Sequence, residues 1–369
     1  MEITIILKQK IEFLPPISNL IDFLIEKNIK INLICTDIEE FNYNKYSSRV
    51  RIFVIKLRNY RFRLFKLFSI VIFRKKVHSF LESNSIIRSN SYVWIASSEA
   101  AIALGYKISK YKFIFQCHEL YDEVYHYRKL NKFYFKNSIL NVCPDNNRAA
   151  IYRYWYSLKQ TPSVLVNFPY NHPRTLKMDI DNLAAQTIVR SLSNKKIILY
   201  MGVISYSRDL MPFFDAVEKM GEEYHILLLG RPLENDGYLE NIMGRYDHVS
   251  HINSLPAPSH LQVASWAYIG ILSYSFSSLN NVFCAPNKIW EYSGFGIPLI
   301  SNDVPGIKDM LARYGSGISI NLELCDSTLI MQTILSIDRN YFEFSENAQR
   351  MFNECDYRKQ LNTILMQLN

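Results

Sequence analysis

The stretch 281–300 reads NVFCAPNKIWEYSGFGIPLI, and the rest of the chain can be understood outward from it. The preceding run, 268–274, is apolar and continuous, as expected of a short buried strand. Pro286 suits the first turn of a helix, which two glycines end before a second strand over 298–301. The sequence therefore predicts a strand–helix–strand unit whose helix begins at the carboxyl edge of a sheet.

Three polar residues, Asn287, Lys288 and Glu291, fall in the first turns of this predicted helix. Ligands of open α/β sheets bind at the carboxyl edge of the strands. The free N–H groups of a helix start and the charge of Lys288 favour a phosphate. The Glu291 carboxylate can accept hydrogen bonds from sugar hydroxyls. The alternative is an ordinary turn in which Lys288 and Glu291 are solvated.

The string Pro-Asn-Lys-Ile-Trp-Glu-Tyr and the glycines after it resemble the donor-binding signature of retaining GT-B glycosyltransferases, in a family-4-like branch. The resemblance implies an α/β fold of two Rossmann-like doubly wound domains that face each other across a cleft. It also implies that Glu291 holds the ribose of a nucleotide sugar and that the neighbouring backbone holds the diphosphate. Many relatives carry an earlier glutamate as well, and Phe283 stands at that position here.

Length and composition agree with a globular protein of two domains. A chain of 369 residues can form two α/β cores. The sequence has no apolar run of about 18 residues, so we expect no transmembrane helix. Its start, MEITIILKQK, has no signal-peptide cleavage site. The 6 cysteines are scattered without a C-x-x-C pair, which indicates reduced thiols in a cytoplasmic protein.

The net charge of +8 is concentrated in the segment 45–76, which is basic and contains no acidic residue. Aromatic and aliphatic residues alternate with the charges, a pattern that can dock on an anionic membrane surface. Nucleic acid is the competing polyanion, although no recognition motif is present, and a solvated helix is the simplest alternative. We favour peripheral association with the inner face of the cell membrane. The residues expected to form this membrane and acceptor surface are Arg58, Arg61, Arg63 and Lys66.

Short apolar runs alternate with helical patterns through the first half of the chain, which predicts a parallel, doubly wound sheet. No G-x-G-x-x-G follows the first expected strand, and this argues against a dehydrogenase. The expected strands cover 3–7, 30–35, 50–57, 92–96 and 112–116.

The loop 117–123, CHELYDE, follows the fifth expected strand and is dense in titratable groups. His118 could donate to a phosphate or sugar oxygen, and Glu119, Asp122 or Glu123 could orient an acceptor hydroxyl. The alternatives are a structural hydrogen-bonding histidine and carboxylates that cap the next helix. The His-Glu-Leu string resembles the corresponding GT-B loop, which implies a catalytic role for His118 and then for Glu119.

The strand 196–202 opens the second half and ends in Gly202, where the backbone can approach phosphates closely. Arg208 precedes a helix and can bind a diphosphate bidentately. The GT-B resemblance implies a second cation after the glycine, where Val203 stands, and we expect Lys288 to supply that charge. The same resemblance places Leu255 beside the nucleotide base.

We predict four segments. Residues 1–170 form an N-terminal acceptor-binding domain, 171–194 a linker, 195–344 a donor-binding domain, and 345–369 a crossover helix that packs on the first domain. The linker contains Asp-Ile-Asp at 179–181. Because no strands flank this D-x-D string, we do not interpret it as a metal site.

The GT-B resemblance implies a hexosyltransferase in cell-surface polysaccharide biosynthesis. We expect the donor to be a nucleotide diphosphate sugar, UDP-linked rather than GDP-linked, and the acceptor to be a glycan or a lipid-linked glycan. We expect no cofactor and no metal, and retention of configuration; if inversion occurs, Glu119 or Asp122 is the expected base. The alternatives are a nucleotide-sugar epimerase and an inactive GT-B relative that binds a glycan or partner, which Phe283 and Val203 keep open.

Overall fold

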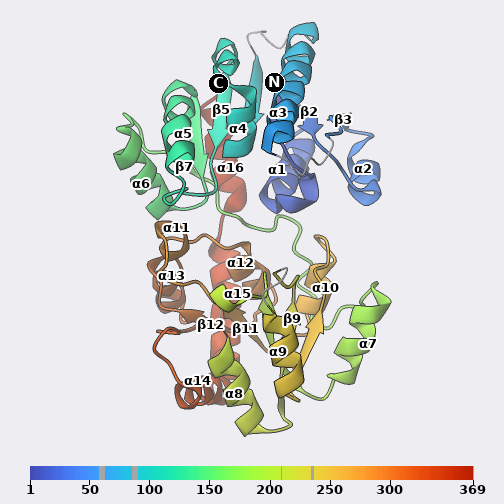
Figure 1. Ribbon diagram of the computed structural model, residues 1–369, viewed down its shortest axis with the longest axis vertical. Helices are drawn as coiled ribbons and strands as arrows, with labels where there is room; N and C mark the ends of the chain where they lie inside the picture. The colour runs from blue at the N-terminus through green and yellow to red at the C-terminus, as the bar shows by residue number, and fades with distance from the viewer. Residues whose placement is uncertain (58–62, 85–89, 209, 234–236, 369) are drawn as a thin grey trace. The chain divides into compact units, whose positions relative to one another are not determined.

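The computed structural model describes residues 1–57, 63–84, 90–208, 210–233 and 237–368. The chain divides into two compact units (Figure 1). Unit 1 comprises Met1–Tyr170 and Tyr357–Asn369, and unit 2 comprises Asn171–Asp356. The chain therefore passes from one unit to the other twice.

Unit 1 contains a seven-stranded sheet in the order β3-β2-β1-β4-β5-β6-β7, and every neighbouring pair is parallel. Its central strands are buried almost throughout, because helices cover both faces of the sheet. The strands are β1 (Glu2–Ile6), β2 (Lys30–Cys35), β3 (Val50–Val54), β4 (Ser91–Ile95), β5 (Phe113–Gln116), β6 (Leu140–Cys143) and β7 (Ser163–Val164). The helices are α1 (Pro15–Glu26), α2 (Glu40–Tyr46), α3 (Arg63–Ser83), α4 (Ser98–Leu104), α5 (Tyr125–Asn137), α6 (Asn146–Tyr156) and α16 (Tyr357–Met366).

Unit 2 contains a six-stranded parallel sheet in the order β10-β9-β8-β11-β12-β13. The strand order reverses between β8 and β11, which makes this pair the topological switch point. The strands are β8 (Lys196–Met201), β9 (Tyr224–Leu229), β10 (Val249–Ile252), β11 (Ile269–Leu272), β12 (Leu299–Asn302) and β13 (Gly317–Ile320). The helices are α7 (Leu183–Ser191), α8 (Met211–Met220), α9 (Tyr238–Arg245), α10 (His260–Ala264), α11 (Leu279–Val282), α12 (Asn287–Ser293), α13 (Pro305–Tyr314), α14 (Ser327–Arg339) and α15 (Tyr341–Glu354).

The predicted fold class is confirmed: two parallel Rossmann-like sheets with helices between successive strands. Local helix signals are also present. The Ser97 side chain accepts from the Ala100 N–H and caps α4, and Pro286 is the N-cap residue of α12. On α8 the inner face is buried, including Phe213, Phe214 and Val217.

Two details differ from the sequence-based expectation. The segment expected as one C-terminal helix holds two, because the backbone at Cys355 is extended and ends α15. The second of them, α16, belongs to unit 1, where the Leu368 carbonyl accepts from the Tyr92 hydroxyl. The segment 171–194 belongs to unit 2 and includes α7, which the Asn182 side chain caps.

Among the described residues, no helix combines the length and the hydropathy that a membrane span requires.

Candidate functional site

Arg208 lies at the topological switch point of unit 2. It ends a short turn after β8, and its Nη1 donates to the Ser273 carbonyl, directly after β11, over 2.6 Å. The guanidinium lies 4.4 Å from the centre of the Tyr274 ring. A guanidinium has five N–H donors, so this one bond leaves donors for a bidentate anion. The predicted diphosphate ligand Arg208 is therefore fixed at the edge where doubly wound sheets bind ligands.

The backbone at Gly202 is in close contact with Gly230, at the end of β9. A Cβ on Gly230 would lie 1.7 Å from the Gly202 carbonyl oxygen, so no side chain fits there. A Cβ on Gly202 would lie 3.0 Å from the Tyr200 hydroxyl, a tight but flexible contact. The sequence singled out Gly202, whereas the packing depends most on Gly230. Val203, beside them, is 39% exposed.

Helix α12 is fixed on the sheet by Tyr292. This residue is fully buried, and its hydroxyl donates to the Leu199 carbonyl of β8 over 2.8 Å. Its ring lies on Gly270 of β11, where a Cβ would approach the ring to 2.8 Å. The absence of a side chain at Gly270 thus allows the Tyr292 ring to pack on the strand. As a result, α12 packs on β8 and β11 next to the switch point.

The predicted residues of α12 have different surroundings. Asn287 and Lys288 are half-buried. In the part of the chain that the structure describes, Lys288 has no hydrogen-bond or ion-pair partner. Glu291 is 6% exposed, so its carboxylate is in the protein interior. The helix therefore carries a lysine without a hydrogen-bond or ion-pair partner among the described residues, one turn before a buried carboxylate.

The two carboxylate oxygens of Glu291 are not equivalent. Oε1 lies 3.3 Å from Nε2 of His260, the first residue of α10. Oε2 is buried and has no hydrogen-bond partner among the described residues. Burial raises the pKa of Glu291, but His260, Lys288 and His172 together outweigh it and lower the pKa to about 2. The buried group is therefore an anion with one vacant acceptor.

His172 forms a hydrogen bond with the main chain of Glu291. Its Nε2 donates to the Glu291 carbonyl over 2.9 Å, and its Nδ1 accepts from the Arg174 N–H over 3.1 Å. These two bonds fix the neutral tautomer, and burial lowers the pKa of His172 to about 4. A Cβ on Gly294 would lie 2.6 Å from the His172 ring. Gly294, expected only to stop the helix, also makes room for this histidine.

Leu255, predicted beside the nucleotide base, is half-buried in the loop after β10. This loop leads directly to His260, whose N–H donates to the Pro256 carbonyl over 3.3 Å. The structure thus connects the predicted base-binding turn with Glu291 through His260. Sequence reasoning missed both His260 and His172, which are far from Glu291 along the chain and belong to no recognised motif.

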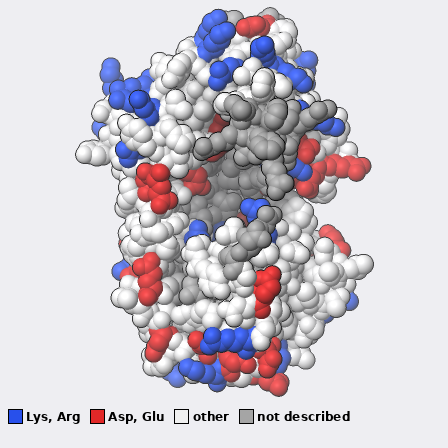
Figure 2. Space-filling view, viewed as in Figure 1, with Lys and Arg blue, Asp and Glu red and all other residues white. Residues whose placement is uncertain are grey.

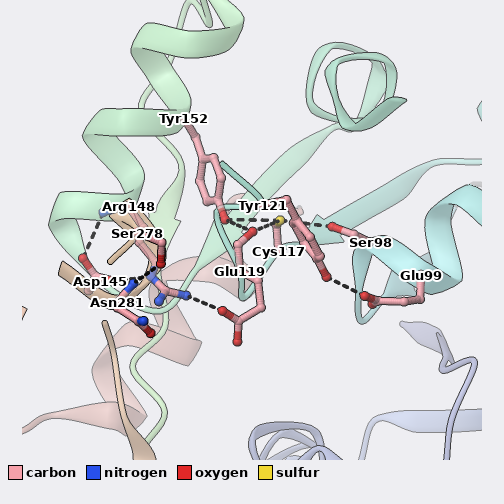
Figure 3. Close-up of polar contacts among 10 residues, drawn as sticks. All are labelled: Ser98, Glu99, Cys117, Glu119, Tyr121, Asp145, Arg148, Tyr152, Ser278 and Asn281. Atoms are coloured by element: carbon pink, nitrogen blue, oxygen red, sulfur yellow. Dashed lines mark hydrogen bonds and ion pairs between the residues drawn. The ribbon is translucent and has the colours of Figure 1, made fainter. Parts of the chain in front are cut away.

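In unit 1, the loop after β5 is held from both sides by buried polar contacts (Figure 3). The Cys117 thiol lies 3.3 Å from the Ser98 hydroxyl, and the Tyr152 hydroxyl donates to the Glu119 carbonyl over 2.8 Å. The Tyr121 hydroxyl donates to the Glu99 carboxylate over 2.6 Å. Burial raises the pKa of the Cys117 thiol to about 11, so this cysteine has a structural role.

His118 is partly buried, and its Nε2 has no hydrogen-bond partner within the described residues. Burial and the charge of Arg148 lower its pKa to about 4, although the Ala96 backbone and the Asn167 side chain favour protonation. His118 is therefore neutral at pH 7. It can form a hydrogen bond with a hydroxyl, but it is not a protonated imidazolium.

Glu119 and its neighbours lie nearer to solvent. The Glu119 side chain is 50% exposed, and its carboxylate lies 3.7 Å from Nη1 of the buried Arg148. Figure 3 shows it directed toward this guanidinium. Val124 is the N-cap residue of α5 and its side chain makes no capping hydrogen bond, so neither Asp122 nor Glu123 occupies the N-cap position.

The basic segment is described in part. Arg58 and Arg61 lie outside the described residues, and Arg63 and Lys66 belong to the first turn of α3. Further along α3, one stretch exposes large apolar side chains next to the exposed Lys75 and Lys76. Lys and Arg side chains gather over the region of unit 1 that carries α3 and α5 (Figure 2). The exposed apolar residues are Leu67, Phe68, Val71 and Ile72.

Within the described ranges, no three or more His, Cys, Asp or Glu side chains come together in a cluster that could hold a metal ion. In the D-x-D string, the Asp181 carboxylate accepts from the Gln262 amide over 2.7 Å, and the Asp181 N–H donates back to Gln262 over 3.1 Å. This aspartate ties the start of unit 2 to α10.

No protein-family profile and no curated protein sequence matches the chain. Solved structures do match it in fold. Anabaena HepE, crystallised with UDP-glucose, superposes with a TM-score of 0.72 at 11% identity, covering 100% of this chain and 99% of that one. A glycosyltransferase from Rickettsia africae gives 0.71 at 13% identity, covering 100% and 97%. WaaG, a glycosyltransferase involved in lipopolysaccharide biosynthesis, gives 0.64 at 11% identity, covering 98% of both chains. The chain has the GT-B glycosyltransferase fold.

Proposed function

We propose that this protein is a retaining, family-4-like hexosyltransferase that moves a sugar from a UDP-sugar to a glycan or lipid-linked acceptor. The proposal is carried by the Glu291 carboxylate, which is 6% exposed, ionised and unpartnered at Oε2 among the described residues. Buried polar atoms are nearly always hydrogen-bonded, so a vacant buried anion calls for a donor from a ligand. A ribose supplies such donors in its two hydroxyl groups.

The diphosphate of the donor is assigned to the positive groups of the same unit. Arg208 is held at the switch point, and Lys288 lies one helical turn before Glu291. The Asn287 region and the backbone at Gly202 complete the proposed donor site, with Leu255 beside the base. These charges would stabilise the departing diphosphate without a metal ion or cofactor. HepE, of the same fold, was crystallised with UDP-glucose, which supports uridine as the base.

The acceptor and the chemistry are assigned to unit 1. His118 is neutral at pH 7 and has a vacant buried nitrogen within the described residues, so it can bind a hydroxyl of either substrate. Glu119 can orient an acceptor hydroxyl from its exposed position beside Arg148. Retention follows from the family resemblance; in an inverting reaction Glu119 would be the general base.

Helix α3 is proposed to bring the enzyme to a lipid-linked acceptor on the cytoplasmic face of the membrane. Its Leu67, Phe68, Val71 and Ile72 are between 39% and 61% exposed, and Lys75 and Lys76 follow them. Apolar side chains beside lysines suit the boundary between acyl chains and anionic headgroups. This location is consistent with a role in cell-surface polysaccharide biosynthesis; WaaG, of the same fold, is a glycosyltransferase involved in lipopolysaccharide biosynthesis.

The first test is stabilisation of the protein by UDP. At a concentration of about 100 times its dissociation constant, UDP should stabilise the native protein by about 2.7 kcal/mol, observed as a raised melting temperature. Glu291→Gln keeps the side-chain volume but removes the charge, and should lose more than half of this stabilisation. Glu240→Gln, at an exposed position of α9, is the matched control and should respond like the native protein.

A protein that neither UDP nor GDP stabilises would contradict the donor site. Such a result would favour the inactive GT-B relative, for which the exposed Val203 at the switch point is the specific argument. UDP stabilisation combined with slow hydrolysis of a UDP-hexose, within a panel of nucleotide sugars, supports a transferase and identifies the sugar. Interconversion of two UDP-hexoses without an acceptor would identify an epimerase instead.

A further inference from the structure

We propose that His260 is a positioning residue that selects for ribose by holding the Glu291 carboxylate with Oε2 toward the nucleotide. This inference rests on the proposed function of the same site. It concerns a residue that the motif does not contain and that the structure brings to Glu291 from another helix. Their side chains are largely buried, with exposures of 18% for His260 and 8% for Glu291.

The main chain at Glu291 has little freedom. The residue lies within α12, its carbonyl accepts from His172, and the adjoining Tyr292 is fixed on β8 and β11. What remains adjustable is the glutamate side chain, which has three rotatable bonds. The direction of the vacant acceptor is therefore decided by whatever binds the other oxygen.

His260 binds that other oxygen. Its Nε2 lies 3.3 Å from Oε1, so one oxygen is occupied by the protein and the second is left for the ligand. The imidazole comes from α10, the Lys288 charge from α12, and the ring of His172 from the start of unit 2. Of these three groups, His260 is the one in contact with the carboxylate. Without it, both oxygens would lack a protein partner and the side chain could rotate.

His260 also connects the ribose contact to the predicted base contact. Its N–H donates to the Pro256 carbonyl, and the Leu261 N–H donates to the Pro258 carbonyl over 2.9 Å. The loop that contains Leu255 and the start of α10 are thus one hydrogen-bonded segment. This segment would contact the base of a nucleoside. Through His260, it would also position Glu291 for the contact with the sugar.

The experiment compares the binding of UDP, 2′-deoxy-UDP and 3′-deoxy-UDP by calorimetry. In the native protein, removal of the hydroxyl that meets Oε2 should weaken binding about 10- to 100-fold, because a buried charged acceptor is left unpaired. His260→Ala should reduce this penalty to about 2-fold, which is the range of independent effects. The affinity for the penalised deoxy analogue itself should change little. His260→Gln should restore part of the penalty, because its amide can donate to Oε1.

The matched control is His248→Ala. His248 forms an imidazole–carboxylate pair of the same length, 3.3 Å to Glu218, elsewhere in unit 2. This variant should keep the native deoxy penalty. In a Glu291→Gln background, adding His260→Ala should change the penalty by no more than about 2-fold.

The outcomes separate the two proposals. Failure of the native protein to bind UDP contradicts the proposed function itself. If UDP binds and His260→Ala weakens UDP and both deoxy analogues by the same factor, His260 is merely structural and this inference is wrong. The inference is also overturned if the deoxy penalty is unchanged in His260→Ala. A penalty that disappears in His260→Ala and partly returns in His260→Gln supports it.

Discussion

Each unit has a polar side chain with a vacant atom near the carboxyl edge of its sheet, His118 in unit 1 and Glu291 in unit 2. The two side chains differ in charge. The vacant atoms, His118 Nε2 and Glu291 Oε2, are both buried and unpartnered within the described residues. At both sites a side chain donates to the local main chain: Tyr152 to the Glu119 carbonyl in the loop after β5, and His172 to the Glu291 carbonyl in α12. The scaffolding is thus alike, although the residues differ.

The difference lies in the neighbouring charges. Arg148 helps to keep His118 neutral, with its pKa lowered to about 4, whereas His260 and Lys288 keep Glu291 ionised, with its pKa lowered to about 2. The unit 2 site thus holds a permanent anion, suited to hydroxyl donors. The unit 1 site holds a neutral imidazole, which suits a substrate hydroxyl that donates a hydrogen bond at one stage of a reaction and accepts one at another. One topology supports both because burial and the neighbouring charges together set the protonation states.

The comparison is tested most severely by removing the side-chain donor to the main chain at each site, His172 at Glu291 and Tyr152 at Glu119. Gly294→Ala would place a Cβ 2.6 Å from the His172 ring and displace the donor to the Glu291 carbonyl. We expect unit 2 to lose about 2–3 kcal/mol. Tyr152→Phe removes one hydroxyl from unit 1 and should cost about 1 kcal/mol. Hydrogen exchange resolved by peptide measures the two units separately.

Gly244→Ala is the control for the glycine substitution, since nothing lies within 4 Å of its added Cβ in α9. It should leave unit 2 unchanged or more stable by up to about 1 kcal/mol. Equal losses in Gly294→Ala and Gly244→Ala would show that the histidine does not depend on Gly294.

A second prediction separates the functions of the two vacant atoms. His118→Ala should lower kcat about 100-fold, as expected for loss of one group that bonds the reacting atoms. The UDP dissociation constant should stay close to that of the native protein, because the donor contacts are assigned to unit 2. Steady-state kinetics and calorimetry give the two values. His126→Ala, an exposed histidine of α5, is the control. Parallel losses of turnover and UDP affinity in His118→Ala would contradict the division of labour.

The smallest expected effect concerns the surfaces of the two units. Phe68→Glu, on the exposed apolar stretch of α3, should weaken binding to anionic phospholipid vesicles about 10-fold, through lost apolar burial and added negative charge. Phe342→Glu is the matched change in unit 2, at a phenylalanine of α15 that is 86% exposed. Co-sedimentation with vesicles measures both. Equal binding by the two variants would remove α3 from the proposed membrane surface.

The sequence by itself determined the fold class and the position of half of the proposed donor site. Apolar runs and helical periods are local properties, so they predicted two doubly wound sheets with Arg208, Lys288 and Glu291 at strand ends. Helix signals were also local, which is why Pro286 was placed correctly at a helix start.

The tertiary structure alone decided what surrounds those residues. His260 and His172 meet Glu291, and Arg148 lies beside Glu119, because of strand order and helix placement, which no local pattern encodes. The contact of Gly230 with Gly202 has the same origin, since it joins the ends of two adjacent strands. Protonation depends on these long-range neighbours. The sequence could therefore name Glu291 and His118, but only the folded chain shows that one is a buried anion and the other a neutral imidazole.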